Sequence, residues 1–527
     1  MKKFFIGFLL LVFSSVAVFA QTTTGRLSGT VSSPDGLLPG ATVTATDNTT
    51  GKSLTTITSG DGAFLFSQVE FGVYTVKVTA SGFKSFIANS VKIDVGREYT
   101  LTPTLEIGSV EESVTVTAGA DIITSNTAQI SNTVSPQQIL SLPMITRSPL
   151  ALTTLQAGVQ SNPFQGTSIN GQRTTMTNIT RDGVNIQDTF IRSNATDFAP
   201  GRPSVDDTAE FTITTTNQEA DQGAGGAQIR LVTPRGTKDF HGAVFAYNRN
   251  SGFAANSFFN NRTPNLADGS RSPTAIKPPF RNRNQYGAKV SGPFWVPAFG
   301  EGTPFFHKNK AFFFFSYEGI IDPVTAAATR TILTPSARGG AFTYARTNST
   351  SVTPFCPSQT IGSICTIPNI LDFARTNLTG GATIPATIDP IVQARVISLL
   401  PTASNFTGGD GLNTAGFRLL RGSNQRRNQY ASRVDIDIND LNSVLFIYNY
   451  NKEVNLRPDV DTSGFGTTPD VEQFSDNRQV TAAYRRVFSS NIVNEFRGGI
   501  FKTIVPFDTT FTPPAFHLGL ARGCLKT

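Results

Sequence analysis

The sequence has few of the side chains that enzymes and metal sites use most often. Its 527 residues include three cysteines, three histidines and one tryptophan, and only 15% of them are charged. His241, His307 and His517 lie in separate segments, with no serine or cysteine nucleophile motif near them. So few and so widely spread side chains offer too few ligands for a metal centre. We therefore expect no enzymatic activity, no cofactor and no metal site.

Beyond the amino terminus, no apolar run is long enough to cross a membrane as a helix. At the amino terminus, Lys2 and Lys3 precede an apolar run that ends at Ala20. This pattern predicts a cleaved signal peptide at residues 1–20, with an uncleaved anchor as the alternative. The net charge of +7 does not arise from a cluster of basic residues, so we expect no nucleic-acid partner.

The sequence is rich in residues that favour strands and turns, with 42 phenylalanines and 46 glycines. Apolar and polar residues alternate in Arg433–Asn439, where Val434, Ile436 and Ile438 face one way and Arg433, Asp435 and Asp437 the other. About seven segments share this alternation. They lie near Phe240–Asn248, Gln285–Phe294, Ala311–Gly319, Gln429–Asn439, Ser443–Asn451, Gln479–Phe488 and Asn491–Lys502.

An exported chain without membrane helices can still span a membrane as a closed barrel, because a barrel satisfies all of its backbone hydrogen bonds. The alternating segments then have an apolar face toward lipid and a charged face toward a wet lumen. The residues expected to face lipid are Val290, Phe294, Phe313, Phe315 and Tyr317. The fold class is therefore mainly β.

The region 25–107 contains short β-rich segments separated by turns such as Gly60-Asp61-Gly62, which predicts a small β-sandwich. Its motifs resemble the carboxypeptidase regulatory-like domain: Gly29–Val31, Leu38–Val43, Ser59–Phe64, Gly72–Val76 and Ser81–Phe83. The resemblance implies a non-catalytic module, either a spacer or docking unit or a weak carbohydrate binder.

The region 110–235 combines an extended acidic segment, two expected short helices and glycine-rich turns, which predicts an α+β domain. Its motifs are similar to the plug of TonB-dependent outer-membrane receptors, and segments that follow it resemble the Oar-like branch of that superfamily. The plug motifs are Val114–Ala118, Ile139–Pro143, Asn170–Arg173, Asp182–Val184 and Gly223–Thr233, and the Oar-like ones include Gly236–Phe245, Asn284–Gly287 and Lys308–Gly319. Thr233-Pro234-Arg235 departs from relatives, which more often have a Lys-Ser pair there.

The resemblance implies a candidate TonB box, a short extended segment to which the inner-membrane protein TonB adds a strand. The candidate residues are Glu112, Ser113, Val114, Thr115, Val116 and Thr117, and the alternative is a linker strand without a special role. The plug motif residues are Asn170, Gly171, Arg173, Asp182 and Gly183. Asp182 could instead be a catalytic or metal-binding carboxylate, but Arg181-Asp182-Gly183 suits a tight turn with a local salt bridge.

The implied function is TonB-energised uptake, through a plugged barrel in the outer membrane, of a large or scarce substrate such as a glycan, a peptide or a metal chelate. The expected partners are TonB, outer-membrane lipid and an unknown extracellular substrate. The alternative is an adhesion or organising protein that transports nothing, with carbohydrate binding by the sandwich. The sandwich and plug are expected on the periplasmic side.

We thus predict a signal peptide at 1–20, a sandwich at 25–107, a TonB box and plug at 110–235, and the first part of an antiparallel transmembrane barrel at 236–527. Cys356 and Cys365 can form a disulfide that staples a loop, which leaves Cys524 unpaired. About seven strands are too few for a plugged barrel of ~22. Because the chain also does not end on an aromatic residue, we expect a truncated copy that does not insert as a closed channel.

Overall fold

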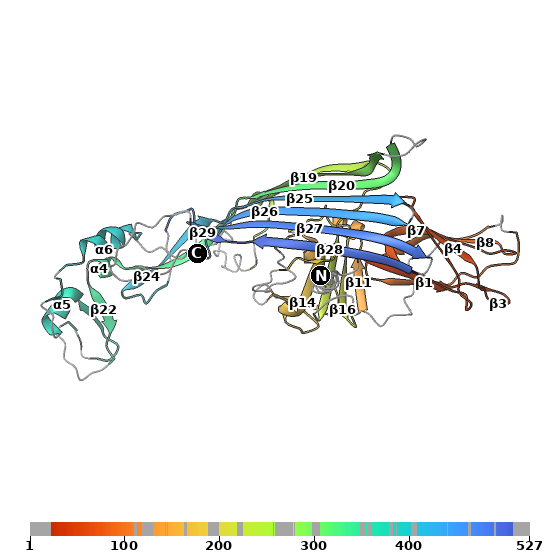
Figure 1. Cartoon of the computed structure of the whole chain (residues 1–527). Coiled ribbons are helices and arrows are strands. Elements are labelled where there is room, and N and C mark those ends of the chain that lie inside the picture. Colours follow the sequence, from red (N-terminus) through yellow and green to blue (C-terminus); the bar gives the residue numbers. More distant parts are fainter. Residues whose placement is uncertain are drawn as a thin grey trace, which may run out of the picture.

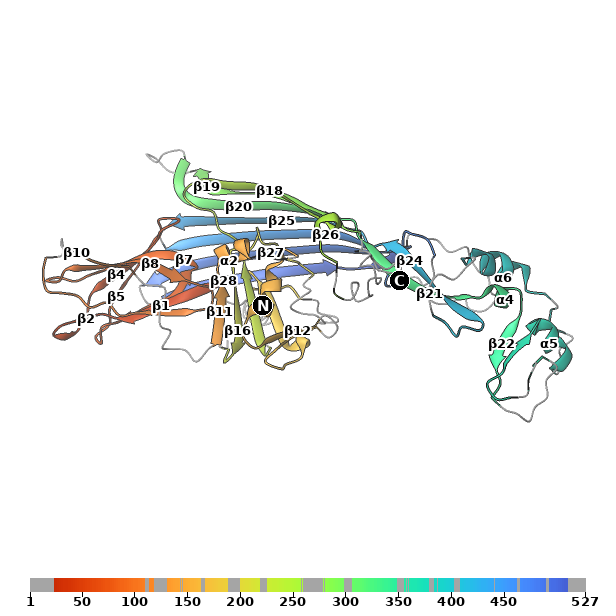
Figure 2. The same ribbon diagram turned by 180° about the vertical axis from the view of Figure 1, so that it is seen from behind.

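The computed structural model describes most of residues 23–509 as three packed regions: a sandwich, a mixed α/β region and a long sheet (Figures 1 and 2). Within that span the undescribed residues are 110–112, 118–129, 143, 145, 163–165, 188–199, 219–224, 257, 259–277, 279, 298–305, 348–354, 357, 359, 379–382, 386, 402–407, 440, 462–464 and 490–491. The predicted signal peptide, Glu112 and Cys524 lie outside the described residues.

The amino-terminal region is a sandwich of two sheets, with strand orders β6-β1-β9 and β10-β8-β7-β4-β5. Alternate residues of these strands point inward, and Leu27, Val43 and Val76 are fully buried between the sheets. The strands are β1 (Thr24–Thr30), β2 (Ser32–Ser33), β3 (Gly36–Leu37), β4 (Thr42–Asp47), β5 (Ser53–Ile57), β6 (Ala63–Glu70), β7 (Gly72–Thr79), β8 (Ser85–Ile93), β9 (Glu98–Leu101) and β10 (Ser113–Thr117).

The middle region, which we call the plug, is built on a mixed sheet of order β11-β16-β17-β14-β15. Helix α2 (Pro136–Ser141) begins with a capping box between Ser135 and Gln138, and it buries Ile139 against this sheet. The other elements are β11 (Ile130–Val134), η1 (Pro149–Leu155), β12 (Val159–Asn162), β13 (Gly166–Ile169), η2 (Thr174–Met176), β14 (Thr177–Arg181), β15 (Val184–Asn185), β16 (Glu210–Thr216) and β17 (Ala227–Val232).

The third region is a sheet of long antiparallel strands, which we call the barrel sheet. Its strands follow one another in chain order, and all seven alternating segments of the sequence belong to it. They are β18 (His241–Asn250), β19 (Asn282–Pro297), β20 (Phe306–Asp322), β25 (Gln425–Asn439), β26 (Asn442–Leu456), β27 (Val471–Ser489) and β28 (Ile492–Ile504), with β29 (Phe507–Thr509) paired to β27. Short turns join β25 to β26 and β27 to β28 at the sandwich end.

The two faces of the barrel sheet differ as the alternation predicts. Arg433 and Asp435 point inward and are buried, whereas Val290, Phe294 and Phe315 on the other face are 40%, 53% and 42% exposed. This outer face carries a row of aromatic rings, in which Tyr317 lies 6.3 Å from Tyr286 and 5.0 Å from Tyr430, and Tyr430 lies 5.9 Å from Tyr450. An exposed apolar face with an aromatic row is what a lipid-facing surface requires.

The long connection between β20 and β25 lies at the end of the barrel sheet away from the sandwich (Figure 1). A disulfide there joins Cys356 to Cys365, which lies in strand β23 of the β22–β23 hairpin. The elements of this connection are β21 (Thr325–Leu333), α4 (Pro335–Arg338), β22 (Phe342–Ala345), β23 (Ile364–Ile367), α5 (Ile370–Asn377), α6 (Pro390–Arg395), η6 (Ile397–Leu399) and β24 (Thr414–Gly422), and η4 (Ser251–Phe253) follows β18.

Candidate functional site

Two of the predicted plug motifs, Asn170–Arg173 and Asp182–Val184, each contain a turn with two consecutive residues in the left-handed backbone conformation. Asn170 and Gly171 have φ angles of 51° and 74°, and Asp182 and Gly183 have 52° and 84°. Asp182 and Gly183 are the two central residues of the β14–β15 hairpin, where positive φ at both positions favours Asp-Gly. Arg173 is exposed beyond the first turn. The motif residues thus occupy two separate turns rather than one cluster.

Asp182 is a buried structural acceptor. One carboxylate oxygen accepts a hydrogen bond from the Thr233 amide at 2.8 Å, and the other accepts from the Thr233 hydroxyl at 2.6 Å. The Arg181 guanidinium lies 3.8 Å from Asp182 and 3.3 Å from Asp207. Burial raises the pKa of the Asp207 carboxyl, although Arg181 acts in the opposite direction. A carboxylate engaged in this way supports the turn and its salt bridge rather than chemistry on a substrate.

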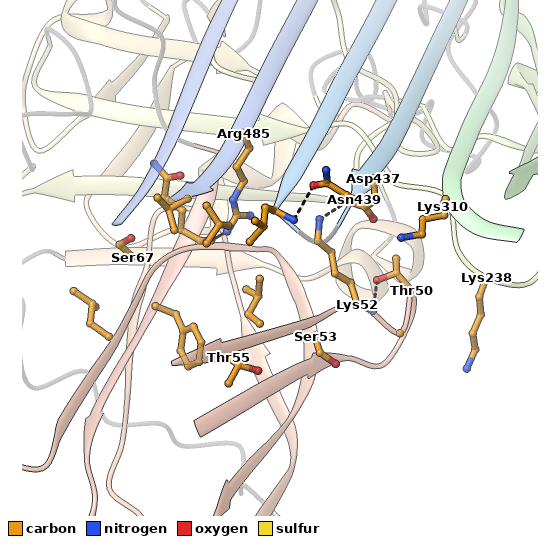
Figure 3. Close-up of a pocket in the computed structure, with 18 residues that line it drawn as sticks. Thr50, Lys52, Ser53, Thr55, Ser67, Lys238, Lys310, Asp437, Asn439 and Arg485 are labelled. Atoms are coloured by element: carbon orange, nitrogen blue, oxygen red, sulfur yellow. Dashed lines mark hydrogen bonds and ion pairs between the residues drawn. The ribbon is translucent and has the colours of Figure 1, made fainter. Parts of the chain in front are cut away.

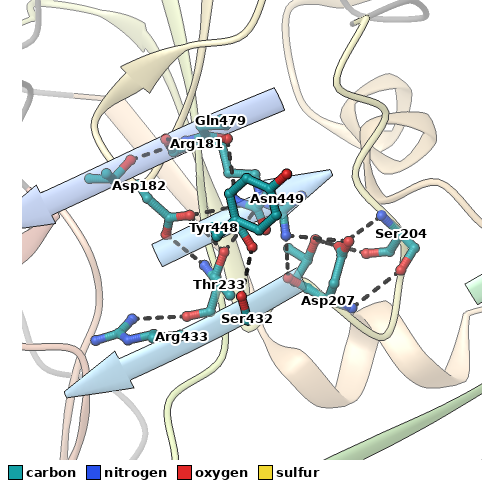
Figure 4. Close-up of polar contacts among 12 residues, drawn as sticks. Arg181, Asp182, Ser204, Asp207, Thr233, Ser432, Arg433, Tyr448, Asn449 and Gln479 are labelled. Atoms are coloured by element: carbon teal, nitrogen blue, oxygen red, sulfur yellow. Dashed lines mark hydrogen bonds and ion pairs between the residues drawn. The ribbon is translucent and has the colours of Figure 1, made fainter. Parts of the chain in front are cut away.

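The plug is docked on the inner face of the barrel sheet by side chains of the wall that donate to backbone carbonyls of the plug (Figure 4). Gln479 donates to the Arg181 carbonyl at 2.7 Å, and Arg433 donates to the Thr233 carbonyl at 2.9 Å. Gln429 also donates to the Asp207 carboxylate. Because every residue has a backbone carbonyl, the contacts of Gln479 and Arg433 depend on the path of the plug backbone and not on the side chains of Arg181 and Thr233.

The interface between plug and wall is polar and incompletely bonded. The amide nitrogen and oxygen of Asn451 and the amide oxygen of Gln429 are buried without a hydrogen-bond partner among the described residues. Water can bond such groups where there is room.

Arg235, which follows the last strand of the plug, forms ion pairs with both the sandwich and the barrel sheet. Its guanidinium lies 2.6 Å from Glu70 and 3.4 Å from Asp47, both of the sandwich, and 3.8 Å from Asp435 of β25. Burial alone would raise the pKa of Glu70, but Arg235, and with it Lys52, lowers this pKa to about 2. Glu70 therefore stays ionised, and the junction is held by charge.

The sandwich also contacts the plug directly, through the turn that follows β8. The Val95 amide donates to the Glu210 carboxylate at 2.7 Å, and the Thr212 hydroxyl donates to the Val95 carbonyl at 3.3 Å. Burial, reinforced by the neighbouring Asp94, raises the pKa of Glu210 from its ordinary value of 4.5 to about 8. Glu210 is thus protonated at neutral pH in the docked arrangement.

The described part of the candidate TonB box, Ser113–Thr117, is strand β10 at the edge of a sandwich sheet. It pairs in parallel with β8, so that Ser113 lies opposite Ser85, Thr115 opposite Ile87 and Thr117 opposite Asn89. No described strand pairs with the other edge of β10. The sequence identified an extended segment here, but it carried no signal of the partner strand 28 positions earlier.

Neither a metal centre nor a helical membrane span is found in the described part of the chain. No three His, Cys, Asp or Glu side chains are grouped so that they could hold a metal ion there. No helix within the same residues is long and apolar enough to cross a membrane.

Comparison with known proteins identifies the regions. Residues 232–522 match the family described as outer membrane beta barrel domain, and residues 26–106 match the carboxypeptidase regulatory-like domain. The chain is 25% identical over 295 residues to the TonB-dependent transporter Oar of Myxococcus xanthus, a match that covers 53% of this chain and 26% of Oar. The chain thus spans about a quarter of the length of that relative.

Among solved structures, the transporter YddB of Escherichia coli is 12% identical, with 67% of this chain and 36% of YddB covered and a TM-score of 0.37. The ferric enterobactin receptor PfeA of Pseudomonas aeruginosa is 10% identical, with 71% of this chain and 45% of PfeA covered and a TM-score of 0.34.

The barrel-domain match extends over more than half of the chain, so the chain belongs to the outer membrane β-barrel family. Its amino-terminal region is a carboxypeptidase regulatory-like domain, and the chain is similar to the TonB-dependent transporter Oar. These matches confirm the predicted barrel and carboxypeptidase regulatory-like domains, the mainly β fold class and the outer-membrane location.

The ion-pair and hydrogen-bond network of Asp182 generates a stability prediction. In Asp182→Asn, the side chain keeps its size and tolerates the left-handed backbone, but it loses its charge beside Arg181 and one acceptor for Thr233. We expect the plug to lose about 1–3 kcal/mol of stability. Hydrogen exchange of the β14 and β17 amides measures this loss. Asp61→Asn, in an exposed turn of the sandwich, is the control, and an equal loss there would contradict the assignment.

The protonated state of Glu210 generates a pH prediction. Because docking raises this pKa from 4.5 to about 8, the docked state retains a proton that the undocked state releases. The contribution of Glu210 to docking is therefore fully present below pH 4.5 and is lost as the pH rises to about 8. Glu210→Gln keeps an acceptor for Val95 and should remove this part of the pH dependence. Thermal midpoints at pH 5 and pH 8.5 test it, with Glu106→Gln, an exposed sandwich carboxylate, as the control.

Proposed function

We propose that this protein takes up a large or scarce solute, such as a glycan, a peptide or a metal chelate, across the outer membrane with energy supplied by TonB. The observation that carries the proposal is the polar docking of the plug on the inner face of the barrel sheet, through Gln479, Arg433 and Gln429. A plug held in this way can be displaced by a pull and can return to its place when the pull ends.

In such barrels the short turns face the periplasm and the long connections face the exterior. The short turns of the barrel sheet lie at the end occupied by the sandwich, and the connection between β20 and β25 lies at the other end (Figure 2). The sandwich and the TonB box are therefore assigned to the periplasmic side, where TonB reaches them, and the long connection to the side where solute binds.

Strand β10 supports the assignment of the TonB box because it has an edge available for strand addition. A strand added to an exposed edge gains affinity from main-chain hydrogen bonds. Its other edge is held by β8 of the sandwich. A pull on β10 must therefore break this parallel ladder before it reaches the plug, whose first described strand is β11. In this scheme the sandwich holds the TonB box in place until the ladder between β8 and β10 is broken.

Deletion of Glu112–Thr117 tests the TonB-box assignment. We expect the deletion to abolish energised uptake and to leave surface binding of the solute intact, because the long external connection does not involve β10. Uptake of radiolabelled solute by energised cells and binding to de-energised cells measure the two steps. Uptake equal to that of the unaltered protein would reject the assignment. The adhesion role is favoured instead if the unaltered protein never supports uptake and the deletion abolishes both cell adhesion and solute binding.

A disulfide lock tests whether β10 has to leave β8. Thr115→Cys combined with Ile87→Cys places two thiols at paired positions of the ladder. After oxidation, we expect a TonB fragment to bind as before, because it adds to the opposite edge, while uptake is lost. Reduction should restore uptake. The Thr115→Cys single variant is the matched control. Full uptake by the oxidised double variant would show that β10 does not have to leave β8.

A further inference from the structure

Four adjacent strands of the barrel sheet each have a cationic side chain on the outer face, toward the end away from the sandwich. They are Arg426 of β25, Lys452 of β26, Arg478 of β27 and Lys502 of β28, and all four are exposed. Arg478 lies opposite Tyr450 and Lys502 in the ladder, and paired residues of antiparallel strands share a face. Arg426 and Lys452 are on this face too, because an even number of residues separates each from the aromatic-row tyrosine of its own strand. We call these four residues the cation row.

The cation row borders the apolar part of the outer face. On the sandwich side of the row, Phe446 of β26, Val480 of β27 and Ile500 of β28 are 47%, 38% and 73% exposed. Such an apolar surface faces the hydrocarbon of a membrane, and its border lies among the lipid headgroups. The long stems of lysine and arginine keep their charged ends in water at such a border while their carbon atoms cover apolar surface.

Two members of the cation row lie over aromatic rings of the same face. The Arg478 guanidinium is 5.4 Å from the centre of the Tyr450 ring, and the Lys452 ammonium is 5.4 Å from the centre of the Phe474 ring. Tyr450 is also the last ring of the aromatic row described above. Aromatic side chains of this kind collect at the level of the headgroups, so the two cations are held at that level.

The charges of the cation row are only partly balanced within the outer face. Asp476 lies opposite Lys452, and its carboxylate accepts two hydrogen bonds from Arg478, at 2.9 and 3.1 Å. Asp476 therefore offsets one of the four positive charges. Glu472 is on the same face of β27 but lies further from the sandwich than Asp476. Arg478 and Lys502 carry like charges at directly opposite positions, which costs stability. An anion bound between them reverses that cost.

The sandwich end of the same strands has a different arrangement of charge. Arg485 of β27 is on the inner face there and lines a cavity between the sandwich and the barrel strands, in which Lys52 of the sandwich pairs with Asp437 (Figure 3). On the outer face of β27 this end has Arg486, which lies opposite an asparagine on each neighbouring strand. A continuous row of outward cations is thus found at one border of the apolar face and not at the other.

We propose that the cation row binds the phosphate headgroup of an anionic lipid in the outer leaflet of the outer membrane. Neighbouring strands lie about 4.8 Å apart, so the oxygens of one phosphate can contact cations of two strands. Arginine binds such oxygens with its planar fork and lysine as a point charge. The acyl chains of the same lipid lie along the apolar stretch that contains Phe446 and Ile500. The choice of leaflet rests on the orientation given under the proposed function.

Native mass spectrometry of the full chain in neutral-detergent micelles tests the site, with phosphatidylglycerol as the anionic probe and phosphatidylcholine as the zwitterionic one. We expect saturable binding of phosphatidylglycerol that Lys452→Gln and Lys502→Gln each weaken about fivefold, because each removes one cation from the headgroup level. Lys502→Arg keeps the charge and should retain the binding. Inorganic phosphate should not displace the lipid, because it lacks the apolar body that the outer face holds.

The matched control is Arg486→Gln, which removes the same charge from the same face of β27 at the sandwich end. Nearly unchanged binding by this variant supports the site. The proposal is overturned if the two lipids bind equally, if inorganic phosphate displaces phosphatidylglycerol, or if the control weakens binding as much as Lys502→Gln does. Circular dichroism of each variant establishes that a loss of binding is not a loss of folding. Neither TonB nor solute is present, so a failure of the proposed uptake changes only the leaflet assigned to the site.

Discussion

Hydrogen bonds from side chains of the barrel wall to the backbone of the plug are the interaction on which the rest of the structure depends. Gln479 and Arg433 each donate to a plug carbonyl, and these two contacts join segments more than 190 residues apart. Because water competes for the same groups, such a bond contributes only about 0.5–1.5 kcal/mol net from a neutral donor such as Gln479 and about 1.5–3 kcal/mol from a charged donor such as Arg433. Many modest contacts hold the plug in register on the sheet, and no single contact has to be broken at great cost.

The barrel strands could be predicted from the sequence because their signal is local. A period of two over several residues defines both the strand and its two faces, as in Arg433–Asn439, where Arg433 and Asp435 are buried on the inner face. The plug turns could be predicted for the same reason, since Asn-Gly and Asp-Gly favour positive φ whatever surrounds them. In these cases the neighbouring residues alone determine the conformation.

The contacts that join the regions could not be predicted in this way, because each depends on residues that are far apart in the sequence. The Thr233-Pro234-Arg235 departure marked Arg235 as unusual, but nothing near it in the sequence indicated Glu70 or Asp435 as its partners. Strand β10 was recognised as extended, yet its pairing with β8 depends on where the sandwich leaves an edge open. The buried state of Glu210 likewise follows from the docking of a turn more than a hundred residues away.

In the uptake proposed above, a pull on β10 reaches strand β11 before any other described strand of the plug. It is the edge strand of the plug sheet, paired only with β16 among the described strands, and it is the first plug strand after β10 in the chain. A force that enters from the amino-terminal side can remove this strand without threading it past any other. The proposed removal of one strand would narrow the plug sheet by about 4.8 Å. The hydrogen bonds of the wall to the Arg181 and Thr233 carbonyls do not involve β11, so the proposed pull would open the plug at one edge and leave the rest of it attached.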